Sequence, residues 1–266
     1  MEKVLCNKKF FLLDMDGTIY LDDTLFDGTL TFLDEVKKKG GRYLFVTNNS
    51  SKSTEAYVNK LQRIGIAATS EDFLTSTDAT ILYLKKNYPN NKFYAMGTKT
   101  FVKQLRESGI DVVESLEDGI TGIVISNDQE LTFPKLDIVS RLLTEHKNIA
   151  YVATNPDWVC PTGYGYVPDC GAFAEMLWRA TGKRPYFVGK PRPEMLLLAM
   201  ERFGYTKEET VMIGDRVYTD IASGYHAGVD TVFVLSGEGT MEDANESETP
   251  PTFIMENIKE VLMNLA

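Results

Sequence analysis

The sequence predicts an α/β protein with a doubly wound, mostly parallel sheet. Short apolar runs that end in polar residues alternate along the chain with segments of helical spacing. Several helix-like segments start at Ser, Thr or Pro and end at Gly, which is typical of helix boundaries. The strands of such a sheet are parallel with right-handed crossovers, so their carboxyl ends lie at one edge, where such sheets bind ligands.

The predicted strands are apolar throughout, as expected for parallel strands that are buried on both faces. They cover 10–14, 43–47, 122–126, 150–154, 211–215 and 231–235. The predicted helices lie between them and include 30–41, 53–65, 135–146, 170–182 and 193–204. The acidic stretch 237–251 is predicted to be a solvated loop before a last short strand and helix.

The middle of the chain has an α/β rhythm of its own. We expect residues 77–184 to form a second α/β domain, inserted into a first domain made of residues 1–76 and 185–266. The 266 residues, 43% of them hydrophobic, suffice for one large domain or two modest ones.

Composition limits the partners. The net charge of −10 repels nucleic acid and anionic membranes, so neither is an expected partner. The chain has no apolar run of about 18 residues and no secretory signal at its start, which predicts a cytoplasmic protein. Its cysteines, Cys6, Cys160 and Cys170, form no CxxC pair and are expected to be reduced.

Three aspartates follow predicted strands. Asp14 and Asp16 come directly after the first apolar run, and Asp215 closes another. At a separation of about 5 Å and an effective dielectric near 20, each pair of carboxylates costs roughly 3 kcal/mol, so a hard cation such as Mg²⁺ is expected. For the pair Asp14 and Asp16 taken alone, the alternative to a metal site is an acidic strand end that is simply solvated. Gly17 allows a sharp turn that points backbone amides at an anion such as phosphate.

Other polar groups follow the same pattern. Thr47 and Asn48 suit phosphate oxygens, and a helix that starts near Ser51 or Ser53 adds its dipole, although this stretch alone also fits a polar turn. Lys190, in a stiff Gly-Lys-Pro turn, provides a point charge. Asp220 in the first turn of a helix fits the helix dipole, and it is also placed to hold Lys190 or a metal-bound water.

In this order, four motifs resemble those of the haloacid dehalogenase superfamily of phosphohydrolases. They are DMDGT (14–18), VTNNS (46–50), GKP (189–191) and GDRVYTD (214–220). The long insertion between the second and third motifs looks like a type II cap. The stretch ATNPD (153–157) and the GAFAEMLWRATGK that follows it are similar to the NagD-type, or nitrophenylphosphatase-like, branch.

The resemblance implies a mechanism. Asp14 attacks phosphorus to give an aspartyl-phosphate, and Asp16 protonates the leaving group and then activates water. Mg²⁺ is held by the Asp14 carboxylate, the Asp16 backbone carbonyl and Asp215. The implied phosphate ligands are Gly17, Thr47, Asn48 and Lys190, with Asp220 in support. Asp16 is often absent from members that do not hydrolyse phosphate, so its presence favours a phosphatase.

The cap region predicts further substrate contacts. Asn155 and Asp157 are expected to face the active site, although an Asn-Pro-Asp turn needs no functional reason. Tyr164 and Tyr166 lie where the related branch carries a small, glycine-rich loop, and this departure concerns the choice of substrate and not the reaction.

We therefore expect a Mg²⁺-dependent phosphomonoesterase that acts on small phosphorylated metabolites, such as sugar phosphates, nucleoside monophosphates or nitrophenyl phosphate, and by analogy a homodimer through the cap. A phosphotransferase or phosphomutase of the same fold is the alternative. A non-enzymatic phospho-receiver module fits less well, because receivers are about half this length and lack the second aspartate. The two histidines, His146 and His226, lie in polar, helix-like segments and disfavour a histidine phosphatase.

Overall fold

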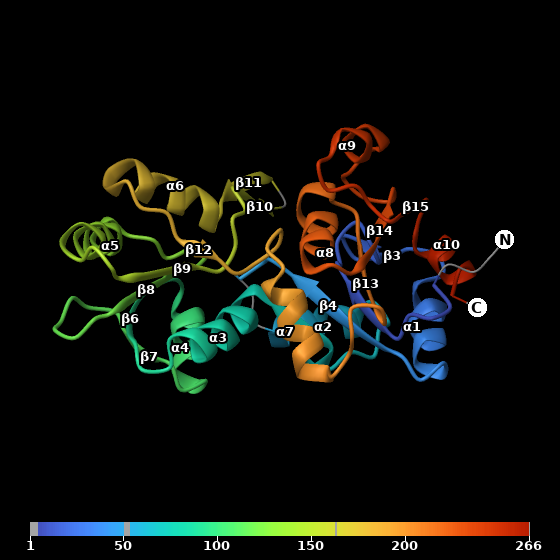
Figure 1. The fold of residues 1–266 in the computed structure, drawn as a ribbon, viewed down its shortest axis with the longest axis horizontal. Helices are drawn as coiled ribbons and strands as arrows, with labels where there is room; N and C mark the ends of the chain where they lie inside the picture. The colour runs from blue at the N-terminus through green and yellow to red at the C-terminus, as the bar shows by residue number, and fades with distance from the viewer. Residues whose placement is uncertain (1–4, 51–53, 163, 266) are drawn as a thin grey trace. The chain divides into compact units, whose positions relative to one another are not determined.

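A computed structural model of the chain describes residues 5–50, 54–162 and 164–265 (Figure 1). The chain folds into two compact units. The first contains residues 1–47, 54–74 and 190–266, and the second contains residues 48–53 and 75–189. The units differ from the predicted domains chiefly in one segment, 48–53, which belongs to the second unit. The predicted start of a helix at Ser51 or Ser53 lies outside the described residues.

The first unit is built on a six-stranded sheet of order β15-β14-β13-β1-β4-β5. All pairs from β15 to β4 are parallel. The strands are β1 (Phe10–Leu13), β4 (Arg42–Thr47), β5 (Phe73–Thr75), β13 (Thr210–Gly214), β14 (Asp230–Val234) and β15 (Phe253–Met255). The short hairpin of β2 (Tyr20–Leu21) and β3 (Thr24–Leu25) follows β1.

Alternate side chains of β1 explain how this sheet is covered on two faces. Phe11 packs with Phe32 at a ring distance of 5.7 Å, in the core shared with α1, α2 and α10. Phe10 points the other way and stacks on Tyr205, just beyond α7. Each fully buried phenylalanine contributes about 1.5–3 kcal/mol. The helices are α1 (Thr29–Lys38), α2 (Thr54–Arg63), α7 (Glu194–Phe203), α8 (Ala222–Ala227), α9 (Met241–Glu246) and α10 (Ile258–Met263), with a 3₁₀ turn η1 (Ser70–Asp72) and a π-helical turn η2 (Val217–Ile221).

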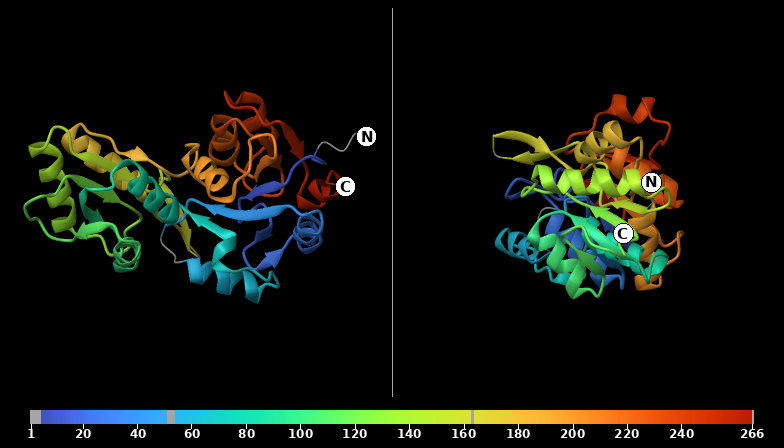
Figure 2. Two further views of the ribbon diagram at one scale, coloured as in Figure 1. Left: turned by 60° about the horizontal axis from the view of Figure 1, so that its bottom comes forward. Right: turned by 90° about the vertical axis from the view of Figure 1, so that its left-hand side faces the viewer.

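The second unit has its own five-stranded parallel sheet, of order β12-β9-β8-β6-β7. Helices α5 and α6 share a buried cluster with one face of this sheet, and α3 and α4 lie on the other face (Figures 1 and 2). The strands are β6 (Lys92–Met96), β7 (Asp111–Val113), β8 (Gly122–Ile125), β9 (Ala150–Ala153) and β12 (Tyr186–Phe187). The helices are α3 (Ser76–Asn87), α4 (Lys99–Glu107), α5 (Phe133–Glu145) and α6 (Cys170–Thr181). An antiparallel hairpin of β10 (Val159–Thr162) and β11 (Gly165–Pro168) precedes α6.

The predicted fold class is confirmed, and every strand and helix named from the sequence is present within a few residues. One prediction was wrong: residues 237–251 are not only a solvated loop. Helix α9 lies within this segment, started by the Thr240 side chain, which accepts from the N–H of Asp243. The beginning of the segment also contacts Asp215.

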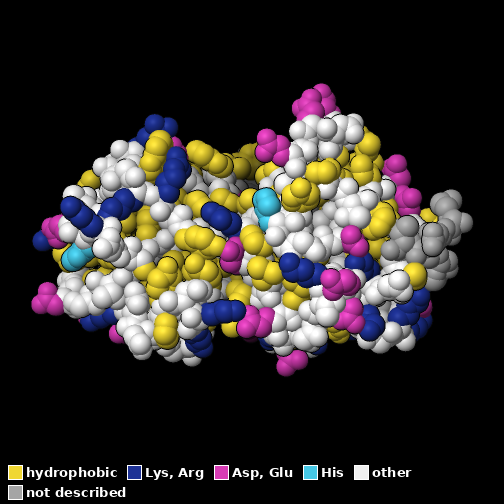
Figure 3. Space-filling view, viewed as in Figure 1, with side chains coloured by type: hydrophobic (Ala, Val, Ile, Leu, Met, Phe, Trp, Pro, Cys, Tyr) yellow, Lys and Arg dark blue, Asp and Glu magenta, His cyan; other side chains and the backbone are white. Residues whose placement is uncertain are grey.

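The surface carries charges of both signs. Figure 3 shows lysine and arginine side chains interspersed with aspartate and glutamate on the face seen there. Among the described residues, no helix combines the length and the apolar character needed to span a membrane.

Candidate active site

The edge of the first sheet brings together residues from three motifs. Strands β13, β1 and β4 are parallel neighbours, and Leu13 is in register with Ile213. Asp14 and Asp215 therefore follow adjacent strands at the same edge, and Thr47 ends the third strand. The backbone N–H of Asp14 donates to the carbonyl of Ile213 at 2.9 Å, so the sheet ladder extends to this residue and fixes its backbone.

Three carboxylates meet at this edge. Oxygen atoms of Asp14, Asp215 and Asp220 all lie within 4.8 Å of one another. Asp215 and Asp220 are almost fully buried. Burial, together with the neighbouring charges of Asp14 and Asp220, raises the pKa of Asp215 to about 7. Burial also raises the pKa of Asp220 to about 6, although the nearby charge of Lys190 opposes the rise.

Lys190 lies among these carboxylates. Its Nζ donates to Asp14 Oδ1 at 2.7 Å, to Asp220 Oδ1 at 2.6 Å and to the backbone carbonyl of Val46 at 3.0 Å. The residue is 2% exposed. Burial alone would lower the pKa of Lys190, but the charges of Asp14 and Asp220 outweigh it and hold this pKa above its ordinary value. Lys190 is therefore a buried cation that is fixed in direction by three acceptors.

The π-helical turn η2 places Asp220. Its Oδ2 accepts from the backbone N–H of Arg216 at 3.1 Å, while its Oδ1 accepts from Lys190. Both carboxylate oxygens are thus engaged, which leaves this side chain little freedom to rotate. π-Helical turns are often found at functional sites.

A turn at Gly17 separates the two aspartates of the first motif. Gly17 has φ +80°, and its N–H donates to the carbonyl of Tyr20 at 2.8 Å. A Cβ at this position would lie 2.4 Å from Asp215 Oδ2, so only glycine fits beside that carboxylate. The close approach brings the backbone of the first motif against the fourth.

The Asp16 side chain lies apart from the three clustered carboxylates. Its Oδ2 is 4.0 Å from Lys60 Nζ, and the Asp16 side chain is 60% exposed. Lys60 in turn lies over the ring of Tyr20, at 3.9 Å from the centroid. Partial burial raises the pKa of Asp16, and the charge of Lys60 opposes this rise. Of Asp16, only the backbone carbonyl was predicted to hold the metal, and that role stays a prediction.

The second motif is divided between the two units. Thr47, at the end of β4, belongs to the first unit and is buried. Asn48 belongs to the second unit, where its Nδ2 donates to Asp157 Oδ1 at 3.1 Å. The carbonyl of Asn48 accepts from Asn155 Nδ2 at 3.0 Å and from Ser76 Oγ at 2.6 Å. Their predicted roles as phosphate ligands stay predictions.

The Asn-Pro-Asp stretch has a structural explanation. Asn155 is fully buried, and its Oδ1 accepts from the N–H of Asp157 at 3.0 Å, which closes a local turn. Its Nδ2 binds the Asn48 carbonyl within the second unit. These contacts account for Asn155 as a structural residue, whereas its predicted contact with substrate is untested.

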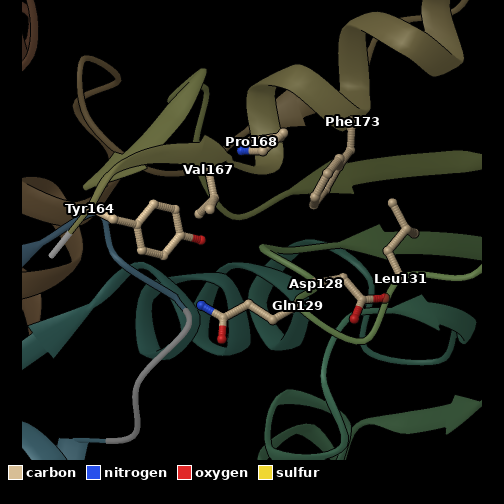
Figure 4. A pocket seen from close by; sticks show the side chains of 7 residues that line it. All are labelled: Asp128, Gln129, Leu131, Tyr164, Val167, Pro168 and Phe173. Atoms are coloured by element: carbon tan, nitrogen blue, oxygen red, sulfur yellow. The ribbon is translucent and has the colours of Figure 1, made fainter. Parts of the chain in front are cut away.

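The two tyrosines predicted from the cap loop differ in their surroundings. Both are exposed, Tyr164 at 83% and Tyr166 at 72%. Tyr164 lines a pocket of about 400 Å³ in the second unit, between the β10–β11 hairpin and the loop after β8 (Figure 4). The other residues that line this pocket are Asp128, Gln129, Leu131, Val167, Pro168 and Phe173. Tyr166 is not among them.

Sequence reasoning missed three charged residues that approach the site. Lys60 faces Asp16 from helix α2, and Glu238 donates its backbone N–H to Asp215 while its side chain pairs with Arg216. The glycines on both sides of Glu238 were the available signal, because they indicate close backbone approach. Nothing in the local sequence around Lys60 indicates its contact with Asp16.

Comparison with known proteins identifies the family. The model of the haloacid dehalogenase-like hydrolases matches residues 11–111, and that of the HAD-hydrolase-like proteins matches residues 187–261. An acid sugar phosphatase from Staphylococcus aureus is 35% identical over 257 residues, which cover 97% of this chain and 98% of that protein. The chain belongs to the haloacid dehalogenase-like hydrolases. The resemblance inferred from the four motifs is thereby confirmed.

Solved structures of two phosphatases have the same fold as this chain over almost its whole length. The 4-nitrophenylphosphatase from Thermotoga maritima is 36% identical with a TM-score of 0.90, over 99% of both chains. A glycerol phosphate phosphatase from Mycobacterium tuberculosis, solved in complex with magnesium, is 28% identical with a TM-score of 0.88, over 100% of this chain and 79% of that one. The chain is accordingly a phosphatase.

Proposed function

We propose that this enzyme is a Mg²⁺-dependent phosphomonoesterase that hydrolyses small phosphorylated metabolites through an aspartyl-phosphate on Asp14. The observation that carries the proposal is the arrangement around Lys190, whose Nζ lies 2.7 Å from Asp14 Oδ1 and 2.6 Å from Asp220 Oδ1. A buried, oriented cation beside a carboxylate nucleophile suits a phosphoryl group, which carries negative charge throughout its transfer.

The residues present fit a magnesium ion. The clustered donors are carboxylate oxygens, the hard ligands that Mg²⁺ prefers. When all three carboxylates are ionised, the single ammonium group of Lys190 that pairs with Asp14 and Asp220 leaves this cluster with an excess of negative charge, which a divalent cation would offset. Asp14 and Asp215 would hold the ion together with the Asp16 carbonyl. When bound, the ion supplies charge neutralisation for the transferring group.

In the proposed first step, an Asp14 oxygen forms a bond to phosphorus as the bond from phosphorus to the ester oxygen breaks. The Asp16 carboxyl gives its proton to the departing oxygen, and the pKa of Asp16, raised by partial burial, favours this protonated form. In the second step water attacks phosphorus, Asp16 takes the proton, and Asp14 leaves as a carboxylate.

The remaining residues of the site are proposed to hold and orient the phosphoryl group. Lys190, the Gly17 turn, Thr47 and Asn48 are proposed to bind the phosphoryl oxygens. Asp220 is proposed to act through Lys190. It accepts a hydrogen bond of 2.6 Å from the Lys190 ammonium group and so holds that group in place for the phosphoryl oxygens.

We assign the chemistry to the first unit, and we assign substrate selection to the second unit, which would act as a cap. The pocket beside Tyr164 supports this assignment, since it joins apolar walls to the polar side chains of Asp128 and Gln129 (Figure 4). Among the relatives are an acid sugar phosphatase and a glycerol phosphate phosphatase. The proposed substrates are therefore sugar phosphates and similar small esters, with nitrophenyl phosphate as a convenient probe. The contacts of Asn155 and Asp157 with substrate belong to the same proposal.

A homodimer through the cap is part of the proposal. It rests on the analogy with the family, and Phe133 and Trp158 are exposed aromatic side chains of the second unit that such a contact could use. Light scattering of the full chain tests it, and a monomer at micromolar concentration would contradict it.

Two experiments test the proposed function: measurement of the amounts of phosphate and alcohol released, and replacement of the proposed nucleophile Asp14. The enzyme should release phosphate and alcohol in equal amounts over many turnovers, whereas a phosphotransferase would yield a new ester. Asp14→Asn should reduce the rate about 10³-fold or more while leaving the circular dichroism spectrum unchanged. The matched control is Asp27→Asn, which removes an exposed carboxylate 2.7 Å from Lys259 and should leave the rate unchanged. Substantial turnover by Asp14→Asn would rule out this nucleophile.

A further inference from the structure

The segment that follows β14 folds against Asp215. Ser236 Oγ donates to the carbonyl of Gly17 at 2.8 Å, and Gly239 donates its N–H to the Asp215 carbonyl at 3.0 Å. Between them, the N–H of Glu238 donates to Asp215 Oδ2 at 2.8 Å. A Cβ on Gly237 would lie only 2.0 Å from that same Oδ2, so the backbone approaches the carboxylate as closely as glycine allows.

The two oxygens of Asp215 are held unequally. Oδ2 accepts the short hydrogen bond from Glu238, whereas the contact to Oδ1, from the Thr18 hydroxyl, is 3.5 Å long. A hydrogen bond to one oxygen sets the plane of a carboxylate and directs the other oxygen. For Asp215 this favours Oδ1 as the oxygen that meets a cation.

The Glu238 side chain makes two contacts of its own. Its Oε2 lies 2.9 Å from Arg216 NH2, and its Oε1 accepts from the Tyr218 hydroxyl at 3.1 Å. Arg216 directly follows Asp215 in the chain, so the ion pair ties this segment to the residue next to the proposed metal ligand. The two charged side chains are 37% and 56% exposed. A pair this exposed contributes little to overall stability, so replacing either residue should leave the fold intact.

We infer that Arg216 and Glu238 are positioning residues for the cation site. Their ion pair holds residues 237–239 in place so that the Glu238 N–H stays on Asp215 Oδ2 and Oδ1 stays directed at the cation. The inference rests on the proposed function, because it concerns the affinity of the same site for Mg²⁺. Partners of metal ligands commonly change metal affinity by 10-fold to 100-fold, roughly, when they are replaced.

An electrostatic role and a positioning role of Arg216 predict opposite changes in Mg²⁺ affinity when the residue is replaced. If the side chain acted only through its charge, Arg216→Gln would tighten Mg²⁺ binding, because a nearby cation would be gone, while Glu238→Gln would weaken it. If the pair acts by positioning, both substitutions weaken binding, and the double variant is no weaker than either single one. Arg216→Lys keeps the charge but loses the fork geometry, and it should recover only part of the affinity.

The test is calorimetric titration of metal-stripped protein with MgCl₂. We expect Mg²⁺ dissociation constants about tenfold larger for Arg216→Gln, Glu238→Gln and the double variant. The matched control is Glu209→Gln, since Glu209 pairs with Lys9 at 2.7 Å just before β13 and β1, at the other end of the same sheet. This variant should bind Mg²⁺ as the wild type does.

The outcomes separate this inference from the proposed function. Tighter or unchanged binding by Arg216→Gln, with normal binding by the wild type, would overturn the positioning role and leave the phosphatase proposal intact. A wild type that binds no Mg²⁺ would overturn the metal in the proposed function and this inference with it. Thermal melting of each metal-free variant checks that the fold is retained, and a Glu238→Gln defect that Arg216→Gln fails to reproduce would also refute the coupling.

Discussion

The ammonium group of Lys190 lies 2.6 Å from Asp220 Oδ1, and both residues are 2% exposed or less. Both residues belong to the first unit, where Lys190 begins the last segment and Asp220 lies in the π-helical turn η2. Their pairing links the position of Lys190 to the correct folding of the fourth motif.

Asp220→Asn should destabilise the protein by about 1–3 kcal/mol. In the wild type, the backbone N–H of Arg216 donates to Asp220 Oδ2 at 3.1 Å. An asparagine oxygen could accept from Lys190 only if the asparagine NH₂ group faced this N–H. One buried donor is left without an acceptor in either orientation. Urea denaturation measures the loss. Glu35→Gln, which breaks the exposed pair with Lys38, is the control and should have little effect. Equal stability of the Asp220 variant and the wild type would contradict the pairing.

The metal-free protein should lose stability as the pH rises from about 4 to about 7. The pKa of Asp215 is about 7 in the folded protein and about 3.9 when unfolded, so the folded state binds more protons in this range. Stability is greatest below the unfolded value and falls until the folded value is passed.

Melting temperatures in EDTA at pH 5 and pH 8 check this expectation. Asp215→Asn should be more stable than the wild type at pH 8 and show a smaller difference between the two pH values. A wild type that melts at a higher temperature at pH 8 than at pH 5, with no such change in the variant, would show that the sign is wrong.

Mg²⁺ affinity should fall about tenfold between pH 8 and pH 6. The ion requires the ionised form of Asp215, whose pKa of about 7 in the metal-free protein leaves roughly one tenth of the molecules ionised at pH 6. Calorimetry at both pH values measures the affinity, and binding should release a proton at the lower pH. Activity should cease in EDTA and return with Mg²⁺. The same affinity at pH 6 and pH 8 would refute this account.

Tyr164→Ala should change the ranking of substrates. The side chain lines the pocket of the second unit, so its loss should alter the ratio of kcat/KM between a sugar phosphate and nitrophenyl phosphate by about tenfold. Tyr166→Ala is the matched control, because Tyr166 is a similarly exposed tyrosine of the same hairpin but does not line the pocket. Equal shifts in the two variants would remove this pocket from substrate selection.

The fold could be predicted because its local signals and its tertiary contacts agree. The runs at 10–14, 43–47 and 211–215 are apolar, since parallel strands covered on both faces leave no polar side. Their last residues meet because the carboxyl ends of parallel strands share one edge. Asp14, Thr47 and Asp215 could therefore be placed together from the sequence.

Contacts that depend on distant loops could not be predicted. The hydrogen bond from Glu238 to Asp215 requires the segment after β14 to return across the sheet edge, and Gly237 and Gly239 indicate a close backbone approach without identifying its partner. The same is true of Lys60, which meets Asp16 only through the packing of α2. Helix α9 was missed because its acidic composition also describes a solvated loop.

The position of β1 also has a consequence for the order in which the chain folds. β1 lies between β4, which is made soon after it, and β13, which is made only after the entire second unit. Asp14 and Lys190 are 176 positions apart in the sequence. On the ribosome, the first strand must therefore wait with one side unpaired while a complete second sheet is synthesised. We expect the nascent chain to acquire phosphatase activity only at the end of its synthesis, when the last strands have joined the sheet.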